Sequence, residues 1–347
     1  MSDLGRKNFV RLGAGGAVAG VLAPSAIAKA LAASSMPVRL GWQPTLNGAR
    51  FFVARDEGLF AKNGLDVDLL KFTSGPAFFA AFQSKSIDVG FMGTPPAIIG
   101  IAQGVPMEIF AVENYAPGSE ALVARAGSGI TTLKDMKGKK IATARGSSGD
   151  YALRKGLKKA GLTLDDIQLV DLSVPALLPA FRRGDIDAGW YWEPWQGEMV
   201  AAGGTQIADD SQVGAFGGIV WVARTEWLQQ NGAATQKLLH TIDDATATIV
   251  KDPRRAAAYI AKDIGVSESI ALRVLTKEAT WPTMRQSYAK DYVLSINPQT
   301  LKEHAGLISA LLPQATFLQE SHSIAAVPDF LSAINTSALS EYLGVKA

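Results

Sequence analysis

Short apolar runs alternate with longer amphipathic stretches over most of the chain. The runs are four to six residues long, as in buried strands, and the stretches between them have the helical spacing of apolar positions. Predicted strands cover residues 38–42, 66–70, 87–92, 107–112, 120–124, 141–144, 168–172, 186–191 and 219–224. This alternation of strand and helix is typical of an α/β fold with mostly parallel sheets.

The order of the strands and helices predicts two lobes. We expect residues 33–123 and 220–347 to form the first lobe and residues 124–219 to form a second lobe inserted into it. Strands near residues 121–124 and 219–223 would connect the lobes and act as hinges. In the second lobe we expect helices over residues 150–160 and 175–183. The later helices, expected over residues 233–251, 254–264, 268–277 and 301–312, are amphipathic packing elements without a chemical motif.

The first 32 residues have the pattern of an export signal. Arg6, Lys7 and Arg11 precede an apolar segment, residues 12–22, and small residues follow it. The order Arg-Lys-Asn-Phe resembles a twin-arginine signal with lysine in the second position, so either that route or general secretion fits. We therefore expect a periplasmic protein with a signal peptide at residues 1–32.

Charge and composition exclude several classes of function. Removal of residues 1–32 would take four basic and one acidic residue from totals of 34 and 32, leaving 30 against 31, so no basic surplus remains to hold nucleic acid. The chain has no cysteine and three histidines without metal-ligand spacing. It also lacks a nucleophile elbow and a phosphate loop. We expect neither an enzyme nor a bound cofactor or metal, and we expect a monomer.

Three Gly/Ser/Thr turns each follow an apolar strand and open a helix. They are Thr73-Ser74-Gly75, Gly93-Thr94 and Gly146-Ser147-Ser148-Gly149. In parallel sheets ligands bind beyond the carboxyl ends of the strands, and helix starts offer free N–H groups to anions. The three turns together would suit a small tetrahedral anion, whereas each turn alone is equally an ordinary helix cap. Arg145 could add a charged fork if its side chain points inward.

Four further residues are candidate ligand contacts, each with a structural alternative. Gln43 follows the first strand and is either a cleft donor or a loop amide. Glu120, at the first crossing strand, either contacts the ligand or pairs across the hinge. Trp192, in an aromatic-rich segment, is the favoured pocket wall. Glu193 either accepts from a ligand amine or places a negative charge at a helix start.

Several motifs taken together resemble the solute-binding proteins of ABC importers for aliphatic sulfonates, taurine and nitrate. The resemblance extends through the mature chain to about residue 224 and rests on these segments: Lys71-Phe72-Thr73-Ser74-Gly75, Ile87-Asp88-Val89-Gly90, Gly93-Thr94-Pro95-Pro96, Ser119-Glu120-Ala121-Leu122-Val123, Arg145-Gly146-Ser147-Ser148 and Trp192-Glu193-Pro194.

The resemblance implies a type II periplasmic-binding-protein fold that holds a ligand between two lobes and delivers it to an inner-membrane permease. It implies ligand contacts at Gln43, Ser74, Gly75, Thr94, Ser147, Ser148, Trp192 and Glu193. Taurine binders of this family have an acid before the returning strand, where this chain has Gly218-Ile219. We therefore expect a sulfonate or related small anion rather than taurine. The alternative is a same-fold binding protein or enzyme for a pyrimidine, a thiamine precursor or another aromatic ligand.

Overall fold

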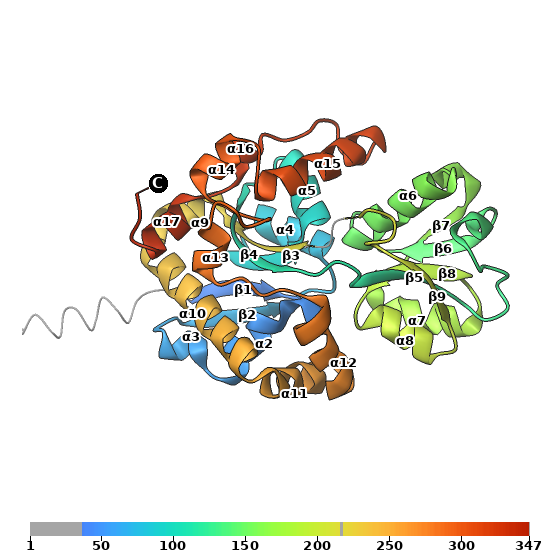
Figure 1. The fold of residues 1–347 in the computed structure, drawn as a ribbon, viewed down its shortest axis with the longest axis horizontal. Coiled ribbons are helices and arrows are strands. Elements are labelled where there is room, and N and C mark those ends of the chain that lie inside the picture. Colours follow the sequence, from blue (N-terminus) through green and yellow to red (C-terminus); the bar gives the residue numbers. More distant parts are fainter. Residues whose placement is uncertain (1–36, 216–217, 347) are drawn as a thin grey trace, which may run out of the picture. The chain divides into compact units, whose positions relative to one another are not determined.

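The computed structural model describes residues 37–215 and 218–346, which fold into two lobes (Figure 1). The segment expected to be a signal peptide lies outside the described residues. Each lobe contains one five-stranded sheet with helices on both faces. Among the described residues, no helix combines the length and the apolar character needed to cross a membrane.

The sheet of the first lobe has the strand order β2-β1-β3-β10-β4. Its strands are β1 (Val38–Trp42), β2 (Val67–Lys71), β3 (Val89–Gly93), β4 (Met107–Tyr115) and β10 (Gly218–Arg224). Strands β1, β2 and β3 are parallel, whereas β10 is antiparallel to both of its neighbours, β3 and β4. Strand β10, which follows the second lobe in the sequence, therefore lies inside the first sheet, between β3 and β4.

The sheet of the second lobe has the matching order β7-β6-β8-β5-β9. Its strands are β5 (Glu120–Ala124), β6 (Lys140–Thr143), β7 (Gln168–Asp171), β8 (Ala188–Trp192) and β9 (Thr205–Asp209). Here β5, the first strand after the chain leaves the first lobe, is the antiparallel one. Each sheet is thus mixed, with four parallel strands and one antiparallel strand.

The chain passes between the lobes in two segments, residues 116–119 and 210–217, of which residues 216 and 217 are not described. Strand β5 pairs only within the second sheet and β10 only within the first. Both segments come directly before the strands expected to be hinges, so each of those strands belongs to the lobe that the chain has just entered.

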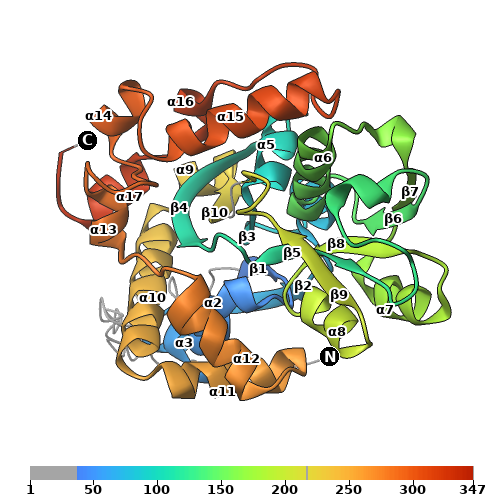
Figure 2. The same cartoon turned by 45° about the vertical axis from the view of Figure 1, so that its right-hand side comes forward.

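Helices cover both faces of each sheet (Figure 2). In the first lobe they are α2 (Ala49–Asp56), α3 (Leu59–Lys62), α4 (Phe78–Gln83), α5 (Thr94–Ala102), α9 (Thr225–Gln230), α10 (Gly232–Lys251), α11 (Pro253–Ile264), α12 (Glu268–Arg273), α13 (Met284–Tyr288), α14 (Pro298–Lys302), α15 (Leu307–Glu320), α16 (Phe330–Ala333) and α17 (Ser337–Tyr342). In the second lobe they are α6 (Ser148–Ala160), α7 (Val174–Arg183) and α8 (Trp195–Ala201).

Helix α6 packs unusually close to strand β8. A Cβ atom added at Gly149 would lie 2.6 Å from the carbonyl oxygen of Trp190, and one added at Gly156 would lie 2.7 Å from its indole ring. A Cβ atom is essentially never this close to another heavy atom, so any residue other than glycine would require the helix or Trp190 to shift. Gly149 and Gly156 lie two turns apart on the same face of α6, and together they set the distance between this helix and the sheet.

A charged pair lies in the core of the first lobe. Arg50 on α2 and Glu113 on β4 are fully buried, with 3.6 Å between Arg50 Nη1 and Glu113 Oε2. Trp221 on β10 donates its indole N–H to the same carboxylate, and Arg50 also donates to the backbone carbonyls of Val112 and Pro282. Burial raises the pKa of Glu113 and lowers that of Arg50, and their mutual attraction opposes both shifts.

Two sequence predictions about elements were wrong. In place of the helix expected at residues 301–312, the structure has two helices, α14 and α15. Asn297 caps the start of α14, and Gly306 separates the two helices because its φ of 59° is not helical. Strand β9 was not predicted. It lies at the edge of its sheet and is largely exposed. Its sequence therefore lacks the apolar run by which the other strands were recognised.

Candidate functional site

A small pocket lies between the two lobes, beyond the carboxyl ends of the strands. It is lined by Gln43, Thr45, Asn47, Gly75, Phe91, Gly93, Pro96, Glu120, Ser147, Ser148, Trp192 and Ile219. Its volume is about 20 Å³, room for roughly one water molecule. The lobes are therefore closed upon each other at this point, and a larger ligand requires them to separate.

The N-terminus of α6 supplies the donors on the second-lobe side of the pocket. Ser147 caps the helix, and its hydroxyl oxygen accepts from the backbone N–H of Asp150 at 3.3 Å. The N–H groups of Ser148 and Gly149 occupy the first helical positions, where no acceptor exists within the helix. With 13 residues, α6 is long enough for its dipole to favour an anion at this end.

The other two turns contribute less than the sequence suggested. Thr94 is fully buried, but its hydroxyl donates to the side chain of Gln314 on α15 at 2.8 Å, outside the pocket. Pro95 and Pro96 follow it and have no N–H, so the start of α5 offers few donors. In the first turn Gly75 lines the pocket, whereas Ser74 does not.

The first lobe also places amide side chains in the pocket. Gln43 donates to the carbonyl of Phe91 at 2.7 Å, which fixes its orientation. Asn47 donates to Ser119 Oγ at 3.1 Å, and its own Oδ1 is buried without a hydrogen-bond partner. An unpaired buried acceptor costs free energy unless a ligand or water donates to it.

Glu120 is the acidic group of the pocket. Glu120 is only 6% exposed, and its Oε2 is buried without a hydrogen-bond partner. Burial and the negative charge of Asp210 raise the pKa of Glu120 to about 8. At neutral pH this carboxyl is therefore mostly protonated and can donate a hydrogen bond as well as accept one.

Glu193 and Arg145 lie outside the pocket. The Glu193 carboxylate is buried and binds Arg273 of α12 at 3.0 Å, together with Gln196 and the backbone N–H of Gly197. It therefore fastens the second lobe to the first. Arg145 is largely exposed and lies 3.7 Å from the Asp171 carboxylate, so its side chain points outward.

The structure thus brings six of the ten predicted residues to one pocket: Gln43, Gly75, Glu120, Ser147, Ser148 and Trp192. It places Ser74, Thr94, Arg145 and Glu193 elsewhere. Gly93, which belongs to one of the three predicted turns, also lines the pocket, and the residues that the sequence reasoning missed are Thr45, Asn47, Phe91, Pro96 and Ile219. Of these, Thr45 and Asn47 follow the first predicted strand as Gln43 does, and that position was the available signal.

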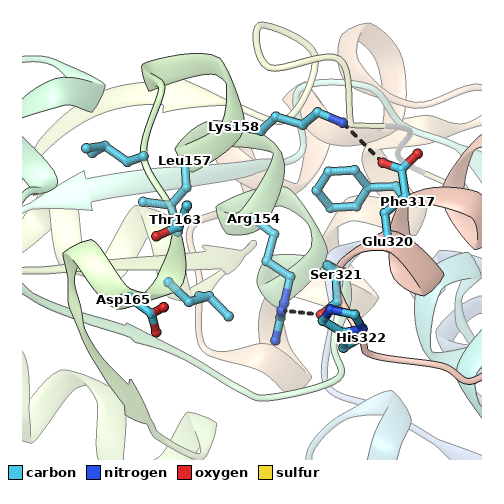
Figure 3. Close-up of a pocket in the computed structure, with 11 residues that line it drawn as sticks. Arg154, Leu157, Lys158, Thr163, Asp165, Phe317, Glu320, Ser321 and His322 are labelled. Carbon is cyan, nitrogen blue, oxygen red and sulfur yellow. Dashed lines mark hydrogen bonds and ion pairs between the residues drawn. The ribbon is translucent and has the colours of Figure 1, made fainter.

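A second contact between the lobes lies outside the pocket, where α15 meets α6 (Figure 3). Phe317 packs edge-on against Tyr151 with ring centroids 5.6 Å apart, and the ammonium groups of Lys155 and Lys158 lie 5.3 and 5.4 Å from its ring. Figure 3 shows Lys158 reaching Glu320, at 3.2 Å. Of these side chains, Lys158, Phe317 and Glu320 line a cavity of about 480 Å³. We call this set the α6–α15 contact.

Comparisons with known proteins identify the family of this chain. The model of the NMT1-like family matches residues 32–265. The chain belongs to this family. It is 30% identical over 266 residues to a putative aliphatic sulfonates-binding protein of Escherichia coli, covering 75% of this chain and 80% of the relative. It is 28% identical over 318 residues to the taurine-binding periplasmic protein of Escherichia coli, covering 89% and 94%.

Solved structures share the fold. The alkanesulfonate-binding protein of Xanthomonas axonopodis pv. citri, bound to MOPS, superposes with a TM-score of 0.72 at 21% identity, covering 87% of this chain and 99% of that one. The chain thus has the periplasmic-binding-protein fold expected from its sequence. It also resembles an enzyme, a 4-amino-5-hydroxymethyl-2-methylpyrimidine phosphate synthase of Saccharomyces cerevisiae, at 27% identity over 232 residues, covering 62% and 67%.

Proposed function

We propose that this protein captures a small sulfonate-type anion between its lobes in the periplasm and delivers it to an ABC permease in the inner membrane. The observation that carries the proposal is the interlobe pocket, in which the start of α6 faces polar groups of the first lobe. An anion there receives N–H and O–H donors at the positive end of a helix. The pocket walls Trp192, Phe91 and Ile219 suit a short apolar chain attached to the anion.

The mechanism is capture rather than catalysis. A ligand that touches both lobes binds the closed form more tightly than the open form and so shifts the population toward closure. We expect residues 116–119 and 210–215 to bend, since each runs from one sheet toward the other. Among the described residues, no group of three or more potential metal ligands comes together, and the proposal uses none.

A ligand screen tests the proposal directly. Thermal stability is measured with short alkanesulfonates, 2-aminoethanesulfonate, nitrate, sulfate esters, aromatic acids and pyrimidines, using protein without residues 1–32. We expect the alkanesulfonates to raise the melting temperature most, because binding to the native state stabilises it. Stabilisation by pyrimidines alone would favour the enzyme-like alternative that the synthase relative represents, and turnover of any ligand would end the capture model.

Ser147→Ala is expected to weaken sulfonate binding about ten-fold. The change removes a buried hydroxyl facing the anion, and a hydrogen bond to a charged group contributes about 1.5–3 kcal/mol. It also removes the cap of α6, so a control with the same local defect is needed. Ser267 caps α12 in the same way, accepting from the N–H of Ile270, but is exposed and lies outside the pocket. Calorimetry should show that Ser267→Ala binds as the wild type does.

Phe317→Ala is expected to weaken binding about ten-fold without touching the pocket. The variant loses the aromatic and cation–π contacts of the α6–α15 contact, which together stabilise closure by about 1–2 kcal/mol. The radius of gyration from small-angle scattering should rise in the ligand-free variant. Phe60→Ala, at a residue of similar burial within the first lobe, should lower stability but leave both quantities unchanged. Equal effects of the two variants would refute a role in closure.

A further inference from the structure

Two buried acids meet where the chain crosses between the lobes. Glu120 begins β5 directly after the first crossing, and Asp210 follows β9 at the start of the second. The backbone N–H of Asp210 donates to the carbonyl of Glu120 at 2.9 Å, which holds the two residues together. Asp210 is only 2% exposed, and Glu120 Oε2 and Asp210 Oδ2 both lack a hydrogen-bond partner.

No described cation neutralises this pair. Among residues 37–215 and 218–346, no lysine or arginine forms an ion pair or hydrogen bond with either carboxyl. The charged groups on the elements packed around the pair are already matched or add negative charge. They are Glu193 with Arg273, Asp150 with Arg154, Lys159 on the carbonyl of Gln212, and Asp209, which binds Ser211 and Gln212.

We propose that Asp210 keeps a proton on the Glu120 carboxyl at neutral pH and thereby makes the pocket prefer anions that lack an ammonium group. Two carboxylates buried side by side without a cation cannot both ionise, so the pair retains at least one proton. Burial raises the pKa of Asp210 to about 7, and burial together with Asp210 raises that of Glu120 to about 8. Asp210 does not line the pocket, so it acts through Glu120 as a positioning residue.

The protonation state decides what the pocket accepts. A neutral Glu120 can donate its O–H to a sulfonate oxygen, whereas an ionised Glu120 repels the sulfonate at close range. A ligand with an ammonium group would pair best with the ionised form, and it must first displace the proton, which costs free energy at neutral pH. The inference rests on the proposed function, because it names the ligand subclass of that same pocket.

The binding test compares ethanesulfonate with 2-aminoethanesulfonate by calorimetry between pH 6 and pH 9.5. In the wild type, ethanesulfonate should bind more tightly at pH 7, and its affinity should fall about ten-fold per pH unit above pH 8 as the proton is lost. In Asp210→Asn the fall should begin at lower pH. The preference for ethanesulfonate at pH 7 should then shrink about ten-fold. Glu120→Gln should remove the pH dependence.

A ligand-free test separates this inference from the proposed function. The native pair holds protons between about pH 4, where free carboxyls titrate, and about pH 8, so its contribution to stability falls as pH rises through that window. Urea unfolding from pH 5 to pH 9 should therefore show a shallower decline in Asp210→Asn than in the wild type. Asp185→Asn, at an exposed acid of the second lobe that pairs with Arg183 and touches neither Glu120 nor Asp210, is the matched control and should keep the wild-type slope.

The outcomes are distinct. Identical pH profiles of binding and of stability in the wild type and Asp210→Asn would overturn the inference. If the wild type binds neither sulfonate at any pH, the proposed function fails. The pH dependence of urea unfolding in the wild type and Asp210→Asn then tests by itself whether the pair holds a proton. Tighter binding of 2-aminoethanesulfonate by the wild type at pH 7 would contradict the stated preference.

Discussion

Glu113→Ala is expected to reduce the free energy of unfolding by about 3–5 kcal/mol, because it leaves the buried guanidinium of Arg50 without its counter-charge. Both side chains are fully buried, so solvent cannot replace the missing carboxylate. The indole N–H of Trp221 would lose its acceptor as well. Urea unfolding followed by tryptophan fluorescence measures the change.

Two further variants make this prediction specific. Asp185→Ala breaks an exposed pair with Arg183 and should change stability little, as is usual for surface ion pairs. The double change Arg50→Met with Glu113→Leu should restore much of the lost stability, since apolar residues of similar size can replace a buried pair. Equal losses in Glu113→Ala and Asp185→Ala would show that the buried pair is not what the first lobe depends on.

Gly93→Val is expected to weaken ligand binding about a hundred-fold while the protein stays folded. Gly93 ends β3 with an extended backbone that valine also adopts. A Cβ atom added there would lie 3.3 Å from the Cβ of Ser148 in the other lobe, and valine adds two methyl groups beyond it. Overpacking costs about 1–3 kcal/mol, and here opening of the lobes relieves it. The strain therefore disfavours the closed arrangement of the lobes and does not lower the free energy of unfolding of the open protein.

Calorimetry and small-angle scattering test this prediction together. The variant should have a larger radius of gyration than the wild type and should not become more compact when ligand is added. Gly232→Val is the control, because a side chain at Gly232 would meet no atom within 4 Å. Wild-type affinity in Gly93→Val would mean that the lobes do not need to approach this closely around the ligand.

The sequence predicted the central strands well for a physical reason. Strands β1 and β5 were expected with the bounds observed, because both are buried and are flanked by polar or turn-forming residues. Strand β9 escaped notice because edge strands can be polar on both faces. The error at α14 and α15 arose because the predicted helix ran through Gly306, where the backbone takes a φ of 59° and ends the helical run.

The sequence predicted those residues of the candidate site that are recognisable from their position at the end of a strand or the start of a helix. The ends of strands and helices are visible in the sequence, and the sequence therefore singled out Ser147, Ser148 and Glu120, which line the candidate pocket. Which partner a side chain takes depends on residues far along the chain. Thr94 binds a residue 220 positions away and Glu193 one 80 positions away, and no spacing rule reveals either pairing.

The close packing of α6 on β8 has a consequence for tuning affinity. The N–H groups at the pocket belong to helix α6. The distance of α6 from the sheet is set on its opposite side, where Gly149 and Gly156 pack against Trp190. Because Gly156 is two turns from the pocket, a smaller residue than Trp190 would let the helix settle or tilt while every ligand-facing side chain stays the same. Ligand preference can therefore drift through substitutions in the core of the second lobe, without any change in the chemistry of the pocket.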